Sequence, residues 1–168
     1  MPLLPERSPG EAGRNPPATV ALDTAIAAEM AAADLYSRLA QQAGSKESRQ
    51  LFLSLTADEQ RHRQTLEQRY LTAVGRPHPS SPFVPFPLPD AAGVMLWPAA
   101  LTLAINAEIQ AHDRYVRLAA ETTDAAGQAI FRDLAADEAT HRRLLEAEYA
   151  ARLGQPFSDY ELSTWVRE

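Results

Sequence analysis

The sequence predicts an all-α protein: a four-helix bundle of two antiparallel helical hairpins joined by a long crossover, plus a short C-terminal helix. Two observations favour this fold class. The 13 prolines gather near the start, between positions 77 and 89, and at 98 and 156, so residues 18–76 and 99–155 contain none. Proline breaks helix interiors, and both proline-free stretches are rich in the helix-favouring residues Ala, Leu, Glu, Gln and Arg. The second observation is an internal repeat at an offset of 79 residues.

Each proline-free stretch contains one break in its helical pattern. In the first stretch Gly44 suits a helix C-cap and Ser45 an N-cap, and in the second Asp124 suits an N-cap. Gly75 and Gly154 are typical of residues that end a helix. These signals predict four helices, over residues 17–43, 46–74, 98–123 and 125–153.

The connections between the predicted helices set the topology. Helices joined by short links form antiparallel hairpins. The proline-rich segment from about 76 to 97 is long enough to run along the bundle and start the second hairpin at the far end, and we expect its phenylalanines to pack on the helices. The bundle is predicted over 17–156, with residues 1–16 as a disordered proline-rich tail. Residues 157–168 are predicted as the short C-terminal helix, opened by a capping box at 158–161.

The composition excludes several functional classes. The chain of 168 residues has 16 Lys and Arg against 22 Asp and Glu, a net charge of −6, so we expect no nucleic-acid partner and no binding to anionic membranes. Without cysteine it cannot form a disulfide, a thiolate zinc site, an iron–sulfur cluster or a rubredoxin-type iron site. No apolar run approaches the roughly 18–20 residues that cross a bilayer, and the first residues lack the features of a signal peptide. We therefore expect a soluble, cytoplasmic protein.

The repeat aligns residues 21–70 with 100–149 without a gap, and 22 of the 50 pairs are identical. Apolar matches such as Phe52 with Phe131 need no function beyond the core. Among the polar matches, Arg38 with Arg117 and Glu67 with Glu146 are expected on a solvated face. The polar matches that point to a site are Glu29 with Glu108, Tyr36 with Tyr115, Asp58-Glu59 with Asp137-Glu138, and His62 with His141. Each half therefore carries a glutamate and a tyrosine on its first predicted helix and a Glu-x-x-His pair on its second.

The spacing of these polar residues favours metal binding. Residues three apart on a helix share a face, so the members of each Glu-x-x-His pair can reach the same ion. Alanines flank Glu29 and Glu108 at helical spacing, which indicates that these carboxylates face a close-packed interior. Four buried carboxylates are costly unless their charge is compensated, and two divalent cations would neutralise them. The alternative is a metal-free network of Glu–His hydrogen bonds.

With one glutamate from each of two helices and Glu-x-x-His from each of the other two, the chain resembles the ferritin-like di-iron carboxylate superfamily. Within it the chain is similar to the rubrerythrin-like branch, over residues 20–153. The resemblance implies a ferritin-like bundle with two metal ions per chain, iron being expected and manganese or zinc the alternatives. It implies Glu59 and Glu138 as bridging ligands, and Asp58 and Asp137 as groups that orient the histidines. The implied metal ligands are Glu29, Glu59, His62, Glu108, Glu138 and His141.

For several further residues the sequence allows more than one role. Tyr36 and Tyr115 are candidate catalytic residues that bond ligand carboxylates or lie near bound oxygen species, or else core residues with satisfied hydroxyls. His112 is either an additional ligand or a histidine outside the ligand set. Ala111 stands where rubrerythrins carry a further carboxylate, and the lack of cysteine excludes their rubredoxin domain.

The resemblance implies an oxidoreductase that reduces peroxide or O₂ at a dinuclear iron site, as a rubrerythrin-like peroxidase or a ferroxidase. Because the chain has no cysteine, an external electron donor is expected. One alternative is an iron-binding or storage protein without turnover, and another is an interaction module that has lost its metal. We expect a homodimer, since this is the commonest oligomer.

Overall fold

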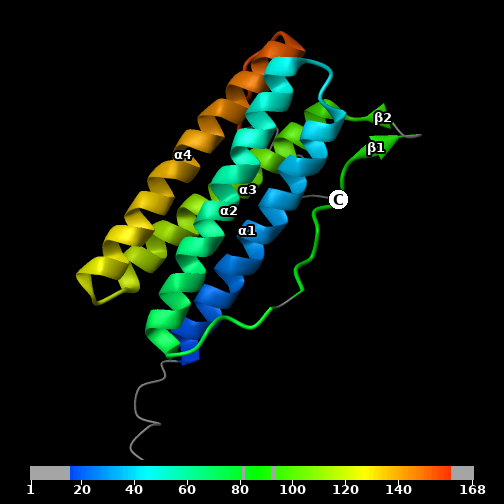
Figure 1. Cartoon of the computed structure of the whole chain (residues 1–168). Helices are drawn as coiled ribbons and strands as arrows, with labels where there is room; N and C mark the ends of the chain where they lie inside the picture. Colours follow the sequence, from blue (N-terminus) through cyan, green and yellow to red (C-terminus); the bar gives the residue numbers. More distant parts are fainter. Residues whose placement is uncertain (1–15, 81, 92–93, 160–168) are drawn as a thin grey trace, which may run out of the picture.

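Four long helices lie side by side in one bundle (Figure 1). The computed structural model describes residues 16–80, 82–91 and 94–159. In chain order the elements are α1 (Pro16–Gln42), α2 (Lys46–Val74), β1 (Asp90–Ala91), β2 (Val94–Met95), α3 (Trp97–Glu121) and α4 (Ala125–Leu153). The predicted all-α bundle is confirmed, and each helix begins and ends close to its predicted position.

Local signals fix the ends of α2 and α4. The side chains of Ser45 and Asp124 accept hydrogen bonds from backbone nitrogens three residues on, at 3.1 and 2.8 Å, so both are the predicted N-caps. Gly75 and Gly154 end the two helices in the left-handed conformation, with φ of 76° and 69°. The predicted C-cap role of Gly44 is wrong. Among the described glycines only Gly75 and Gly154 have a positive φ, so Gly44 does not end α1 in the left-handed conformation.

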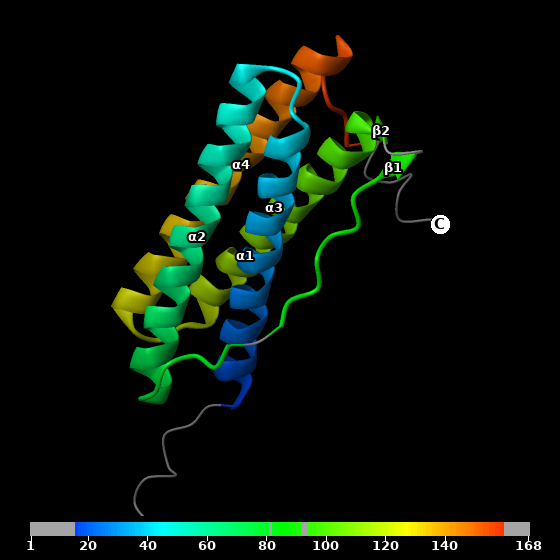
Figure 2. The same cartoon turned by 45° about the vertical axis from the view of Figure 1, so that its right-hand side comes forward.

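The crossover between α2 and α3 runs from the end of α2 along α1 to the start of α3 (Figures 1 and 2). It packs on the helices as predicted, since Phe86 and Leu88 contact the core. Arg38 on α1 donates a hydrogen bond to the carbonyl of Phe86 at 2.8 Å. The antiparallel pair β1–β2, just before α3, was not predicted. The N–H of Leu96 donates to the carbonyl of Pro89 at 2.9 Å, so a proline that lacks a donor still joins this pairing through its acceptor.

Two apolar clusters fill the bundle on either side of a polar layer. On α2, Phe52 and Leu55 belong to one cluster and Leu66 to the other, while the buried Glu59 and His62 lie between them. The other three helices alternate in the same way, with buried polar residues between two apolar segments. Most backbone N–H and C=O groups of this layer form the hydrogen bonds of the helices themselves. The polar side chains of the layer therefore depend on one another for partners.

The predictions for the two ends of the chain, a disordered tail and a C-terminal helix, concern residues that the structure describes only in part. The predicted tail falls almost wholly outside the described residues, and so does most of the predicted C-terminal helix. The described part of the latter, residues 157–159, is not helical, and the Phe157 ring lies edge-on to Tyr149 at 5.2 Å. Within the described ranges, no helix combines the length and the apolar character that a membrane span requires.

Candidate metal centre

Six buried polar side chains meet in the polar layer at the middle of the bundle. They come from all four helices, and none of them is more than 5% exposed. The helices α1 and α3 contribute one glutamate each, and α2 and α4 contribute a glutamate and a histidine three residues apart. These residues are Glu29, Glu59, His62, Glu108, Glu138 and His141. The structure thus brings together every residue that the sequence analysis singled out as a metal ligand.

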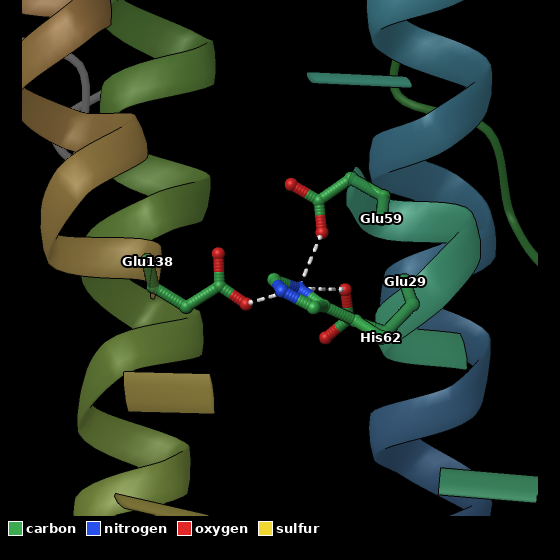
Figure 3. A group of neighbouring side chains, drawn as sticks. All are labelled: Glu29, Glu59, His62 and Glu138. Carbon is green, nitrogen blue, oxygen red and sulfur yellow. Dashed lines mark hydrogen bonds and ion pairs between the residues drawn. The ribbon is translucent and has the colours of Figure 1, made fainter. Parts of the chain in front are cut away.

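His62 faces carboxylates from three helices. Its Nδ1 lies 3.2 Å from Glu59 Oε2 on its own helix and 3.2 Å from Glu138 Oε1 on α4. Glu29 Oε2 on α1 lies 3.7 Å away. Figure 3 shows the three carboxylates converging on one imidazole, with Glu138 reaching it from the other hairpin. One nitrogen atom carries at most one proton, so three carboxylates around it lack enough donors.

His141 has the matching environment on the other side of the layer. Its Nδ1 lies 3.1 Å from Glu138 Oε2 on its own helix and 3.0 Å from Glu59 Oε1 on α2. Glu108 Oε2 on α3 lies 3.6 Å away. The two histidines therefore share Glu59 and Glu138, and each has one further glutamate of its own.

The donor set fits two metal ions. One group of ligand atoms within 4.8 Å of one another comes from Glu29, Glu59, His62 and Glu138, and a second comes from Glu59, Glu108, Glu138 and His141. The carboxylates of Glu59 and Glu138 belong to both groups, where each can contact two ions. The Oε1 atom of each is buried and faces the Nδ1 atom of the opposite hairpin's histidine, but it accepts no well-aligned hydrogen bond. Such orphaned acceptors are rare in folded proteins unless water or an ion completes them.

Aspartates hold the far side of each imidazole, across the two hairpins. His62 Nε2 lies 3.2 Å from Asp137 Oδ2 on α4, and His141 Nε2 lies 3.4 Å from Asp58 Oδ2 on α2. A carboxylate on one ring nitrogen fixes the tautomer and leaves the other nitrogen free to ligate. The family resemblance implied that these aspartates orient histidines, and in the structure each contacts the histidine of the opposite hairpin.

The two tyrosines also connect the hairpins. The hydroxyl of Tyr36 on α1 donates to Glu108 Oε1, and that of Tyr115 on α3 donates to Glu29 Oε1. Both tyrosines are fully buried. Burial, together with the neighbouring carboxylates, raises the pKa of both phenols well above 10.0, so they stay protonated donors. These hydrogen bonds fit both roles left open by the sequence, a partner of the cluster carboxylates and a core residue with a satisfied hydroxyl.

In the metal-free protein the cluster retains protons. Burial raises the pKa of Glu59 well above its usual range and raises that of Glu108 to about 8. Burial disfavours the charged form of His141, but hydrogen bonds to three glutamates, Glu108 foremost, outweigh it and raise its pKa to about 12. The pKa of His62 is raised for the same reason. For Glu138 the hydrogen bonds from both histidines outweigh burial, and its pKa falls to about 2.

The family model described as Rubrerythrin matches residues 21–77 and 99–163. These ranges make up well over half of the chain and include all six residues of the cluster. The chain belongs to the rubrerythrin family. The crossover that covers α1 falls between the two matched ranges, so the family pattern resides in the two hairpins. No curated protein matches the chain.

Three solved structures share the rubrerythrin-like bundle. A hypothetical protein from Pyrococcus furiosus is 23% identical with a TM-score of 0.71, over 83% of this chain and 92% of that one. A dodecameric thioferritin, the bacterioferritin-related protein of Bacteroides fragilis, is 20% identical with a TM-score of 0.64, over 81% and 85%. A protein from Anabaena variabilis with DJ-1/ThiJ/PfpI-like and ferritin-like domains is 19% identical with a TM-score of 0.65. The match covers 92% of this chain but 45% of that protein. At these identities the likeness shows the fold.

Two histidines of this rubrerythrin-family chain lie outside the cluster. His112 is 41% exposed, its Nδ1 lies 3.1 Å from Asp113, and among the described residues it joins neither ligand group. The structure therefore gives no support to the alternative of an additional ligand, because the side chain lines a surface hollow between α3 and α4. His78, in the crossover, lies 3.0 Å from Asp23 on α1 and edge-on to Tyr70. No sequence pattern pairs His78 with these residues, because it has no counterpart in the repeat.

Proposed function

We propose that the chain is a non-haem di-iron carboxylate protein that reduces hydrogen peroxide or O₂, with electrons from an external donor. The observation that carries this proposal is the pair of overlapping ligand groups that share Glu59 and Glu138. Two divalent ions balance the charge of the four buried carboxylates. Membership of the rubrerythrin family supports iron as the metal, although the same oxygen and nitrogen donors also suit manganese and accept zinc.

In this proposal the ligands are the six residues of the cluster, with Glu59 and Glu138 as bridges. Iron held there would supply two electrons, one from each ferrous ion, and these with two protons would convert H₂O₂ into two water molecules. Tyr36 and Tyr115 hold the terminal carboxylates of Glu108 and Glu29 by donating hydrogen bonds to them. The remaining oxygen of each terminal carboxylate is then directed toward its histidine, and the two hydroxyls, which stay protonated, serve as hydrogen-bond donors to the terminal carboxylates.

The surroundings of the cluster keep the imidazoles in position and place apolar side chains on both sides of it. Asp137 and Asp58 fix the two imidazoles by bonding Nε2, which directs Nδ1 at the metal positions. The apolar clusters shield the polar layer on both sides along the bundle. In such an environment the charges of the ligands act on the ions with little screening.

The second candidate is iron storage without catalytic turnover. It is favoured by the likeness to the dodecameric thioferritin, because storage in a protein shell needs a large assembly. Light scattering after size-exclusion chromatography distinguishes the two: the expected homodimer favours the enzyme, and a twelve-subunit particle favours storage.

The test of the proposal is metal content followed by turnover. Protein loaded anaerobically with Fe²⁺ should bind two irons per chain, as measured by elemental analysis. Stopped-flow absorbance should then show oxidation by one equivalent of peroxide faster than that of free Fe²⁺. Full loading without faster oxidation would exclude the oxidoreductase and leave storage. No binding would mean that the cluster is a metal-free hydrogen-bond network.

A further inference from the structure

A cavity of about 250 Å³ lies between α1 and α3, directly beside the metal cluster. Glu29, Glu59 and Glu108 form part of its wall, so the cavity reaches the ligand carboxylates. The histidines and their aspartates belong to α2 and α4, so this side of the cluster is free of them. Alanines of both helices, together with the ring of Phe86 from the crossover, give the cavity apolar walls.

One wall of the cavity is polar, and its residues differ between the two halves of the internal repeat. Asn106, Gln110 and Arg114 recur every fourth residue on α3, share one face of the helix and line the cavity. Their counterparts 79 residues earlier are Ala27, Ala31 and Leu35. Leu35 is fully buried in the cluster against which Phe86 packs, because the crossover runs along α1 (Figure 2). The corresponding side of α3 is open, and exposure to solvent accounts for Asn106 and Gln110.

Exposure does not account for Arg114. Its Nη1 is buried, has no hydrogen-bond partner, and belongs to a side chain that lines the cavity. Within the described residues, no carboxylate forms an ion pair with it. A buried donor left unsatisfied costs about 1–3 kcal/mol, and more when it is charged. The guanidinium is therefore a ready receptor for an anion that enters the cavity.

We propose that this cavity binds a small organic carboxylic acid, with its carboxylate on Arg114 and its apolar body toward Glu29 and Glu108. A guanidinium matches a carboxylate in a two-point geometry, and the alanines with Phe86 suit an apolar body. The volume is adequate, because an apolar cavity of roughly 150 Å³ accommodates benzene. Arg114 lies six residues after Glu108, about 9 Å along the helix axis, so an acid of this size spans the distance from the arginine to the cluster.

This inference rests on the proposed function only for the two metal ions, which neutralise the carboxylates next to the acid. The probe is para-fluorobenzoate, followed by fluorine NMR in a titration with the full chain loaded with Zn²⁺. Zinc keeps the sample diamagnetic and makes binding independent of turnover. We expect saturable binding that weakens about tenfold or more in Arg114→Leu, which restores the residue found at position 35. Arg114→Gln should weaken it less, because the amide still donates a hydrogen bond.

Two further variants separate the cavity from nonspecific attraction. Ala111→Leu fills the cavity and should abolish binding, whereas Arg117→Leu removes an exposed arginine of the same helix and should leave binding unchanged. Circular dichroism and two zinc ions per chain confirm that each variant is folded and loaded. Equal affinity of Arg114→Leu and wild type would overturn the inference, and so would equal affinity for uncharged fluorobenzene or for formate. Failure of the acid to bind leaves iron loading and peroxide oxidation untouched, so it is distinguishable from failure of the proposed function.

Discussion

The imidazoles of His62 and His141 stack across the bundle, with ring centroids 5.5 Å apart and planes 22° from parallel. Each ring carries glutamates of both hairpins on Nδ1 and an aspartate of the opposite hairpin on Nε2. Neither hairpin therefore completes its own half of the site. Metal binding and docking of the two hairpins should be coupled for this reason.

The first prediction concerns the shared carboxylates. Glu59→Ala and Glu138→Ala should each remove most of the bound metal, because each side chain belongs to both ligand groups. The helices should remain, since their caps and apolar clusters are unchanged. Elemental analysis and circular dichroism measure the two effects. Glu67→Ala removes a half-exposed carboxylate paired with Arg63 and is the matched control. Metal content that survives both substitutions would show that the ligand assignment is wrong.

The second prediction concerns Asp137. Asp137→Asn should weaken metal binding about 10-fold or more, because His62 loses the charged partner that orients it. Competition with a coloured chelator measures the affinity. Asp133→Asn, an exposed aspartate one turn earlier on α4, should leave it unchanged. If both variants bind alike, the 3.2 Å contact does not orient the imidazole.

The third prediction concerns Tyr36. Tyr36→Phe removes the donor to Glu108 Oε1 and leaves a buried oxygen without a partner, which should cost about 1–3 kcal/mol of unfolding free energy. Urea titration of the metal-free protein measures this cost. Tyr70→Phe, at a buried tyrosine outside the cluster, is the comparison. Equal losses in the two variants would mean that the bond to Glu108 contributes nothing specific.

The fourth prediction concerns pH. The folded pKa of Glu108 is about 8 against an ordinary 4.5, and the pKa values of Glu59, His62 and His141 are raised as well. The folded metal-free protein thus binds more protons than the unfolded chain, so its unfolding free energy should fall as pH rises from about 5 to 8. The pKa of Glu138 is lowered, and its contribution is already complete above about pH 4.5.

Urea titrations of chelator-treated protein across this range test the pH dependence. The metal-loaded protein should behave in the opposite way, because at higher pH fewer protons oppose metal binding. Isothermal titration in buffers of different ionisation enthalpy should show proton release when metal binds. A metal-free protein of constant stability from about pH 5 to 8 would contradict the raised pKa values.

Much of the fold follows from short-range signals. The caps of α2 and α4 act within a few residues of their own positions, so they can be predicted from the sequence. These caps are Ser45, Gly75, Asp124 and Gly154. Gly44 shows the limit of such signals, since a glycine permits a left-handed turn without requiring one. The pair β1–β2 was missed because two-residue strands leave no periodic pattern. The homodimer, the disordered tail and the role of the six residues as iron ligands stay predictions.

The sequence by itself determined the four helices, the mid-helix position of the six polar residues and the chemistry that they share. Only the tertiary structure decided that Asp58 serves His141, that His112 lines a surface hollow, and that Arg114 lines a cavity beside the cluster. The physical reason is that helical periodicity fixes which residues share a face. It does not fix the rotation and register at which one hairpin docks against the other, and those come from side-chain packing over the whole core.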